Sequence, residues 1–529
     1  MLGRLWILRL TLIFILAMTA CKRDDHQKSN HQSHKKNLPE KPIEEVAPDS
    51  LKLHWFVKRY PKLAQYEPQM RELYRNHHWK FIWFDAKGIT ELGHLLHSKI
   101  NTIETEGVHT KILYKSYLEE IFQPGKPALS NSENDYLISA FYFFYADKVF
   151  HGFDAKTSRE LGWYLPRKKV SYVHYLDSLM ANPKLIEKNE RNILPQYYKL
   201  KEMLGRYQKA ARKNDVDTVK IPFDMDPLKV GDTSDLVAHV RKRLYLMGYL
   251  NQDNQSAIFD ESLARPVRKY KATIGLTPSE LISGKMIRSM NIPLKSRIKT
   301  LMVNMERCRW IPAEMSQGKQ YIAVNIPSYE LVYYKNGKPA LESNVVVGKV
   351  MNQTVIFSGM MKYIVFSPYW NVPPSIIKKE IKPAIEKDKD YLAKHDMEWN
   401  KGRVRQKPGA QNSLGWVKFL FPNSNNIYLH DSPAKSLFNR NSRAFSHGCI
   451  RVAKPLELAQ TLLEDDPNWT PEKVEKVMYA GTESWYTLKE PVPVYIGYFT
   501  AWVDREGILR FYDDVYKRDG RLSELIFKR

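Results

Sequence analysis

The stretch from Ile427 to Val452, IYLHDSPAKSLFNRNSRAFSHGCIRV, concentrates the polar chemistry of this chain between two apolar patterns. Cys449 follows a glycine, with His447 two residues before it and His430 nineteen residues before it. A thiol becomes a useful nucleophile when an imidazole takes its proton and backbone N–H groups receive the developing oxyanion. The stretch therefore predicts a cysteine nucleophile with a histidine base, and the spacing alone allows either histidine.

The flanking residues predict how this stretch is held. Residues 426–430 alternate in polarity, which is typical of a strand whose end presents His430. Gly448 supplies flexible backbone for a turn before the cysteine. Residues 454–459 have the pattern of a helix start with a proline in an early position. We expect the cysteine loop to join strand-rich structure to a helix.

His430 and the run Ser446-His447-Gly448-Cys449-Ile450-Arg451 closely resemble the signature of L,D-transpeptidases, in the branch with a long N-terminal scaffold and a peptidoglycan-binding module. Arg451 stands where many members have Asn, and the long-scaffold branch commonly has Arg there. The surrounding residues that share the resemblance are Lys418, Phe419, Phe421, Pro422, Asn423, Tyr428, Asp431 and Arg443.

The resemblance implies a role for each central residue. Cys449 would attack the carbonyl that joins the third residue of a peptidoglycan stem to the terminal D-Ala, and would form a thioester. His430 would be the proton donor and acceptor, oriented by the backbone carbonyl of Asp431. The backbone N–H groups of Gly448 and Cys449 would form the oxyanion hole, with His447 shaping that loop.

Four residues are predicted to bind the substrate. Arg451 and Arg443 carry planar guanidinium groups that suit the stem carboxylates. A structural ion pair is the alternative for Arg443. The resemblance also points to Tyr428 and Trp370 as substrate contacts.

The function expected from these residues is a cysteine-dependent transferase of cell-wall biogenesis that crosslinks two third stem residues, which would also make it a carbapenem target. An L,D-carboxypeptidase and an enzyme that attaches a protein to the wall would share the same site. A non-catalytic peptidoglycan anchor is a further alternative, as is a zinc site formed by His430, His447 and Cys449. We expect neither a metal nor a cofactor, because the two histidines and the cysteine lack a metal-hydrolase helix motif.

The N-terminus predicts export. Residues 1–21 combine basic residues, a short apolar run and small residues before Cys21, which is typical of a lipoprotein signal that ends at a lipidated cysteine. An ordinary membrane anchor is the alternative reading, although the apolar run is short for a span. Residues 22–50 are polar and charged, which indicates a disordered linker. The predicted location is the cell envelope, with an outer-membrane lipid anchor facing the periplasm.

The remaining 479 residues or so divide into three regions, for an overall multidomain α+β fold. Residues 51–223 have helical periodicity and resemble the scaffold domain of the same branch. Residues 224–297 resemble the small three-helix peptidoglycan-binding fold, either as a glycan binder or as an architectural helper. Residues 298–529 are predicted to form the β-rich catalytic domain, with a lid at about 371–410 or an ordinary surface excursion there. In this domain, Asn336-Gly337 predicts a hairpin turn.

The net charge limits which binding partners are expected, and the number of cysteines limits which disulfides are possible. The formal net charge is +24, but the basic residues spread over the whole length without a nucleic-acid-binding motif. Peptidoglycan stem peptides and anionic envelope surfaces fit better, with no nucleic acid partner. Three cysteines cannot form a disulfide framework, so Cys308 is predicted to be a buried, quiet thiol. The sequence identifies no protein partner.

Overall fold

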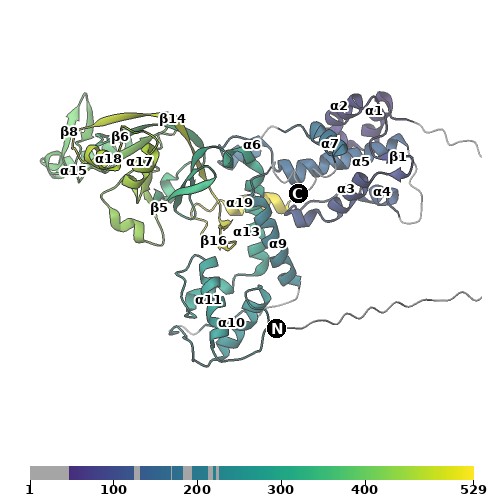
Figure 1. Ribbon diagram of the computed structural model, residues 1–529, viewed down its shortest axis with the longest axis horizontal. Helices are drawn as coiled ribbons and strands as arrows, with labels where there is room; N and C mark the ends of the chain where they lie inside the picture. Colours follow the sequence, from purple (N-terminus) through teal and green to yellow (C-terminus); the bar gives the residue numbers. More distant parts are fainter. Residues whose placement is uncertain are drawn as a thin grey trace, which may run out of the picture. The chain divides into compact units, whose positions relative to one another are not determined.

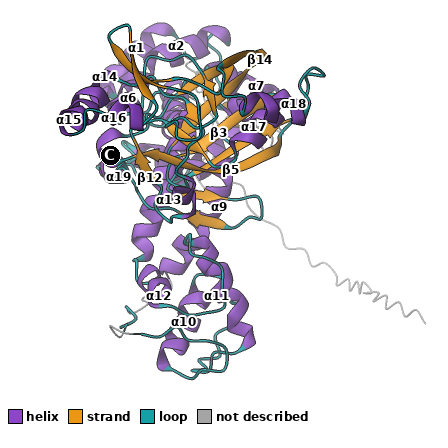
Figure 2. Ribbon diagram, turned by 90° about the vertical axis from the view of Figure 1, so that its left-hand side faces the viewer, coloured by secondary structure: helices purple, strands orange, loops and turns teal. Residues whose placement is uncertain are grey.

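The computed structural model describes residues 47–123, 131–167, 170–182, 193–212, 218–221 and 225–528. The predicted signal segment, Cys21 and most of the predicted linker lie outside these residues. In the described part of the chain, no helix is both long enough and apolar enough to cross a membrane. Helical segments precede a strand-rich C-terminal part, which confirms the predicted multidomain α+β class (Figure 1, Figure 2).

The predicted scaffold region is helical and is organised around α5. Its α-helices are α1 (Ser50–Arg59), α2 (Glu67–Asn76), α3 (Glu91–Asn101), α4 (Lys115–Ile121), α5 (Ser132–Tyr145), α6 (Ala155–Glu160), α7 (Tyr172–Ala181) and α9 (Gln196–Arg212). The Asn131 side chain caps α5 by accepting from a backbone N–H of the first turn. α5 is buried along most of its length, and its Asp135 accepts the backbone N–H groups of Ile82 and Trp83. This carboxylate therefore ties the loop that follows α2 to the domain core.

A small unit with three α-helices follows the scaffold region. Its helices are α10 (Asp235–Leu246), α11 (Glu261–Thr273) and α12 (Gly284–Met290). Ser234, Asp260 and Ser283 cap them by accepting first-turn N–H groups. The inward faces form a separate apolar cluster around Phe259. The described unit thus has three α-helices, and its resemblance to a peptidoglycan-binding fold stays a prediction.

A long helix, α13 (Leu294–Trp310), leads from the small unit into the catalytic domain. It continues through the predicted boundary at 297/298, because its apolar residues keep a helical spacing across that point, and it packs along α9 (Figure 1). Every residue from 301 to 310 is buried. Cys308 is one of them, and burial raises the pKa of its thiol, so it is the buried, unreactive thiol that the sequence predicted.

The described part of the catalytic domain is built on a sheet of nine strands in the order β12-β5-β13-β11-β10-β6-β14-β3-β4 (Figure 2). The strands are β3 (Gln320–Asn325), β4 (Glu330–Lys335), β5 (Lys338–Gly348), β6 (Ser358–Phe366), β10 (Val417–Leu420), β11 (Leu429–His430), β12 (Ala444–Ser446), β13 (Ile450–Val452) and β14 (Ser484–Gly497). Helices α17 (Pro455–Leu463) and α18 (Pro471–Met478) follow the cysteine loop, and α19 (Asp519–Phe527) ends the chain.

The turn between β4 and β5 is the one that the sequence predicted. Asn336 and Gly337 both have positive φ angles, 51° and 74°. Positive φ at both central residues defines the type I′ turn that matches the twist of a two-stranded hairpin. β4 pairs antiparallel with both β3 and β5, so the meander of β3, β4 and β5 starts the sheet.

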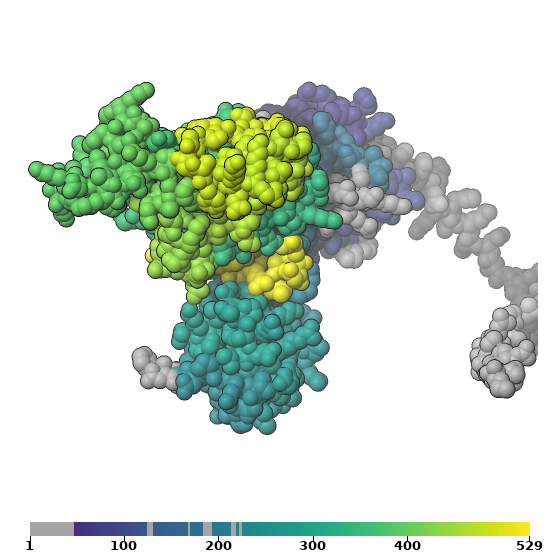
Figure 3. All heavy atoms as spheres, turned by 60° about the vertical axis from the view of Figure 1, so that its left-hand side comes forward, coloured from purple at the N-terminus to yellow at the C-terminus, as the bar shows by residue number. Residues whose placement is uncertain are grey.

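The predicted lid is an insertion between β6 and β10. It contains the strands β7 (Trp370–Asn371), β8 (Met397–Asn400) and β9 (Arg403–Gln406), with short helical segments between β7 and β8. These strands form a small sheet of their own in the order β7-β9-β8. Ile376, Ile381 and Val404 belong to an apolar cluster separate from the main core. The insertion is thus a small folded body, which Figure 3 shows in green on the left.

Candidate active site

Strand register brings five polar residues together at the central sheet. Lys418 of β10 lies opposite His430 of β11, and His430 lies opposite Arg451 of β13. Tyr428 directly precedes β11 and Cys449 directly precedes β13, and the Ile450 N–H donates to the Tyr428 carbonyl at 3.1 Å, so the two segments stay side by side at these residues. The Tyr428 and His430 rings lie 5.6 Å apart between centroids. Tyr428 also interacts with Cys449, so it lies against both the thiol and the imidazole.

His430 is fixed in one orientation. Its Nδ1 lies 2.5 Å from the backbone carbonyl oxygen of Asp431. The Asp431 carboxylate is itself held by the backbone N–H groups of Trp416 and Ser432 and by an ion pair with Lys435. Since a carbonyl can only accept, Nδ1 carries the proton and Nε2 carries the lone pair. This tautomer leaves Nε2 able to act as a base.

The imidazole is neutral in the free protein. Burial lowers the pKa of His430 to about 3, and the neighbouring charges of Arg451 and Lys418 act in the same direction. Both cations are themselves partly desolvated, which lowers the pKa of Lys418 and of Arg451. The row of Lys418, His430 and Arg451 thus places two positive charges around an uncharged base.

Cys449 is partly exposed and makes its closest polar contacts with the segment before β11. Its Sγ lies 3.6 Å from the carbonyl oxygen of Asn426. Burial raises the pKa of the thiol, whereas the backbone and hydroxyl of Tyr428 and the charges of Lys418 and Arg451 lower it. Thiolate formation at Cys449 is therefore opposed by desolvation and supported by two donors and two cations.

The backbone around the thiol is held by Ser446. Its hydroxyl donates to the Cys449 carbonyl at 2.5 Å and accepts the Gly448 N–H at 3.1 Å. Gly448 has a φ angle of +120°, which L side chains rarely adopt. The Gly448 N–H, which the sequence assigned to the oxyanion hole, is thus engaged by Ser446, whereas the Cys449 N–H has no hydrogen-bond partner among the described residues.

Two residues of the insertion contact the site. The Trp370 indole bonds to the Tyr428 hydroxyl, which in turn bonds to the Cys449 sulfur. Glu380, in the helical segment that follows β7, lies 3.1 Å from His447 Nε2. His447 is 42% exposed and points to this carboxylate, whereas His430 is buried in the sheet. The structure therefore separates the two histidines, with His430 beside the cations and His447 beneath the insertion.

Arg443 lies in a different environment from Arg451. Its guanidinium donates to the backbone carbonyls of Arg440, Ser328 and Tyr329. The guanidinium thus bonds to three backbone carbonyls and forms no ion pair among the described residues, while its role in binding a stem carboxylate stays a prediction. For Arg451, by contrast, the described part of the chain supplies no carboxylate within ion-pair distance.

Sequence reasoning missed two supporting residues. Lys418 was noted as part of the signature, but only its pairing with His430 shows that its charge acts on the base. The hydroxyl of Ser446 was not assigned any contact. The alternating pattern of residues 417–420 could have shown which face of the strand carries Lys418. It could not have shown which residue of the neighbouring strand lies opposite it. Within the described ranges, no group of three or more His, Cys, Asp and Glu side chains is arranged to hold a metal ion.

The neutral histidine makes the reactivity of the thiol depend on pH in a defined way. We expect the rate of Cys449 alkylation by iodoacetamide to rise about tenfold per pH unit from about pH 5 to about pH 8. His430, with a pKa of about 3, does not change charge in this window, while the thiol with its raised pKa gains thiolate steadily. The check is mass spectrometry of the peptide that contains Cys449. A rate that is constant between pH 6 and pH 8 would instead show a preformed thiolate–imidazolium pair.

Comparisons with known proteins match two parts of the chain to protein families. Residues 319–487 match the family of L,D-transpeptidase catalytic domains, and residues 68–204 match the family of scaffold domains. A curated protein of Haemophilus influenzae named "Putative L,D-transpeptidase" is 33% identical over 293 residues. This alignment covers 51% of the chain and 57% of the relative, so the chain spans little more than half the length of that protein.

Solved structures of L,D-transpeptidases also align with the chain. One from Xylanimonas cellulosilytica is 12% identical with a TM-score of 0.18, and covers 52% of this chain and all of its own. One from Stackebrandtia nassauensis is 13% identical with a TM-score of 0.19, and covers 53% of this chain and 97% of its own. At such TM-scores the assignment rests on the sequence matches. Residues 319–487 are thus similar to L,D-transpeptidase catalytic domains, and residues 68–204 are similar to scaffold domains.

Proposed function

We propose that this protein is an L,D-transpeptidase that crosslinks peptidoglycan stem peptides through a thioester on Cys449, with release of D-Ala. The observation that carries the proposal is that the neutral His430, with its Nδ1 held by Asp431, pairs with Arg451 in the sheet, while Tyr428 lies against both the His430 ring and the Cys449 thiol. A cysteine nucleophile needs a base to take its proton and a donor for the oxyanion, and this site supplies both.

In the first half-reaction, the Cys449 sulfur attacks the carbonyl carbon between the third stem residue and D-Ala. Nε2 of His430 takes the thiol proton, and the Cys449 N–H receives the oxyanion. The tetrahedral intermediate collapses, the C–N bond breaks, and His430 returns the proton to the amine of the departing D-Ala. The acyl group of the stem then remains on sulfur as a thioester.

The substrate itself would assist this proton transfer. The free His430 is a weak base because burial disfavours its charged form, and the positive charges of Arg451 and Lys418 lower its pKa further. The stem ends in a carboxylate, and Arg451 has no described carboxylate partner to satisfy it. A substrate carboxylate bound to Arg451 would offset part of the positive charge around His430 and raise the pKa of its imidazole. Binding of the correct substrate would thus activate the base.

In the second half-reaction, the side-chain amine of another stem attacks the thioester carbonyl and the C–S bond breaks. His430 takes the proton of the amine and returns it to the Cys449 sulfur, which leaves the direct crosslink between two third residues. Water competes with this amine, so exclusion of water decides the product. The contacts of Trp370 with Tyr428 and of Glu380 with His447 bring the insertion to the site, which supports a role in covering the thioester. We propose that it acts as a lid.

We also propose that the protein is an exported lipoprotein of the cell envelope. The support is the N-terminal sequence, where basic residues, a short apolar run and small residues precede Cys21. A lipid on Cys21 would hold the catalytic domain near the peptidoglycan. Mass spectrometry of the N-terminal peptide after membrane extraction would reveal the lipid.

Product analysis with purified disaccharide-tetrapeptide tests the catalytic proposal. We expect a dimer that has lost one D-Ala, because the amine of a second stem is available as acceptor. Accumulation of disaccharide-tripeptide alone would identify an L,D-carboxypeptidase that uses water. If tetrapeptide stays unchanged while the protein binds sacculi, the anchor interpretation replaces the enzyme.

A further inference from the structure

The loop between β5 and β6, residues 349–357, lies directly behind the cysteine loop. Thr354 in this loop is fully buried. Its hydroxyl donates to the Gly448 carbonyl at 2.8 Å and accepts the Gly348 N–H at 2.9 Å. The single hydroxyl proton is therefore committed to Gly448, and the opposite lone pair is committed to the end of β5.

The hydrogen bond from Thr354 to the Gly448 carbonyl also restrains the peptide bond between Gly448 and Cys449. A trans peptide is planar, and its C=O and N–H point in opposite directions. A hydrogen bond that fixes the Gly448 carbonyl therefore fixes the direction of the Cys449 N–H. Ser446 holds the two flanking groups, the Gly448 N–H and the Cys449 carbonyl. Thr354 is the residue that holds the peptide between them.

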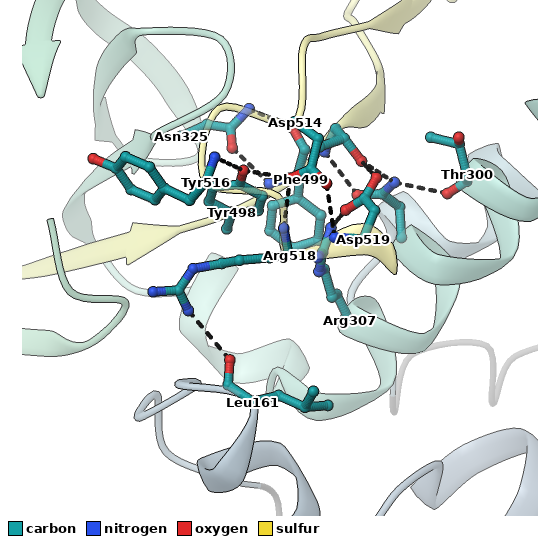
Figure 4. Close-up of polar contacts among 12 residues, drawn as sticks. Leu161, Thr300, Arg307, Asn325, Tyr498, Phe499, Asp514, Tyr516, Arg518 and Asp519 are labelled. Carbon is teal, nitrogen blue, oxygen red and sulfur yellow. Dashed lines mark hydrogen bonds and ion pairs between the residues drawn. The ribbon is translucent and has the colours of Figure 1, made fainter. Parts of the chain in front are cut away.

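Thr354 is itself held by the C-terminal segment. The Tyr516 hydroxyl donates to the Gly348 carbonyl at 2.6 Å and accepts the Thr354 N–H at 3.1 Å. Tyr516 stacks on Tyr498, whose hydroxyl accepts the Tyr516 N–H (Figure 4). The Tyr516 hydroxyl thus connects the backbone of Gly348, just before the loop, to the backbone of Thr354 within it.

The same loop is tied to the scaffold domain. Arg518 donates to the side chain of Gln353 at 2.9 Å and to the backbone carbonyls of Leu161 and Gly162 at 3.2 Å each. Figure 4 shows the Arg518 side chain reaching toward Leu161. Ile356, two residues after Thr354, also bridges the scaffold, because its carbonyl accepts the Tyr164 N–H at 3.0 Å.

We infer that Thr354 is a positioning residue that aims the Cys449 N–H at the oxyanion, and that Tyr516 and Arg518 carry its support to the scaffold domain. This inference rests on the proposed acyl transfer at Cys449. It gives the scaffold domain a part in the geometry of the active site, in addition to any part in binding.

Two reactions of the same thiol separate this role from general damage. Attack on a β-lactam carbonyl forms an oxyanion, whereas alkylation by iodoacetamide does not. The full-length protein, Thr354→Val and Thr354→Ser would each be treated with meropenem and, separately, with iodoacetamide. The rate constants would be measured by mass spectrometry of the Cys449 peptide. Valine keeps the shape of threonine without its hydroxyl, and serine keeps the hydroxyl.

We expect Thr354→Val to slow acylation by about 10- to 100-fold, somewhat less than the loss of a whole oxyanion donor. Alkylation should stay within about twofold of the wild type, and Thr354→Ser should restore most of the acylation rate. Tyr516→Phe, which keeps the stacked ring, should slow acylation in the same selective way even if Thr354→Val fails to fold. Tyr334→Phe is the matched control, since Tyr334 of β4 is also stacked on a second tyrosine, Tyr321, and its strand partners are Tyr321 and Pro339, outside this loop.

Three results would overturn the inference. Unchanged acylation in Thr354→Val would show that the hydroxyl does not aim the N–H. An equal loss of acylation and alkylation would show that it only supports the fold. A wild-type protein that is alkylated but never acylated would remove the proposed acyl transfer, and the inference with it, and this outcome is visible before any variant is tested.

Discussion

Replacement of Cys449 by alanine is expected to abolish release of D-Ala from disaccharide-tetrapeptide, with a loss of about 10⁴-fold or more. The thiol is the only nucleophile that the proposal provides, and the remaining groups of the site cannot form a thioester without it. The measurement is D-Ala release followed by mass spectrometry of the products. The fold should be retained, because the side chain is partly exposed and its polar contact with Asn426 is long.

Cys308→Ala provides the matched control for this experiment. It removes the same chemical group from a fully buried position in α13. We expect it to lower stability by about 1 kcal/mol, as for a small cavity in a packed core, without changing product formation. If Cys449→Ala kept its activity, or if Cys308→Ala lost activity while folded, the assignment of the nucleophile would be wrong.

The second large effect is expected for His430→Asn. Asparagine can still donate to the Asp431 carbonyl from a position close to Nδ1, but it has no counterpart of the Nε2 lone pair. Loss of the base should slow formation of the acyl-enzyme by about 10²- to 10⁴-fold. The rate of acyl-enzyme formation with tetrapeptide, followed by intact-protein mass spectrometry, measures this effect.

His447→Asn is the corresponding control, and it decides between the two histidines that the sequence left open. His447 contacts Glu380 of the insertion and is 42% exposed, so it is not oriented toward a catalytic proton transfer. We expect its replacement to change acyl-enzyme formation by less than about tenfold, with a larger share of hydrolysis if the lid loosens. The opposite ranking of the two variants would identify His447 as the base.

Much of the fold could be predicted from local patterns. The Asn336-Gly337 turn needs positive φ at both positions, and the alternation on either side of it gave the strands. The helices of the scaffold followed from periodicity, and Pro455 marked the start of α17. Each of these elements is decided by residues close together in the chain.

The arrangement of the site could be predicted only in part, because it depends on pairing between distant strands. Periodicity placed His430 at a strand end, but nothing in the spacing shows that it lies opposite Lys418 and Arg451. β11 and β13 pair in parallel, and the local patterns of the residues that connect them do not predict this pairing. Thr354 was missed for the same reason, since a lone threonine near a glycine carries no signal until the Gly448 carbonyl is placed beside it.

The spread of the site over three strands has a practical consequence. Acylation of Cys449 requires the whole sheet to be assembled, because the base and both cations reach the thiol only through strand register. Alkylation requires no such assembly, since any accessible thiolate reacts. The amount of acylated protein, divided by the amount that can be alkylated at Cys449, therefore counts correctly assembled molecules in a preparation. An inhibitor that acylates Cys449 could therefore also be used to measure the fraction of correctly folded protein in a preparation.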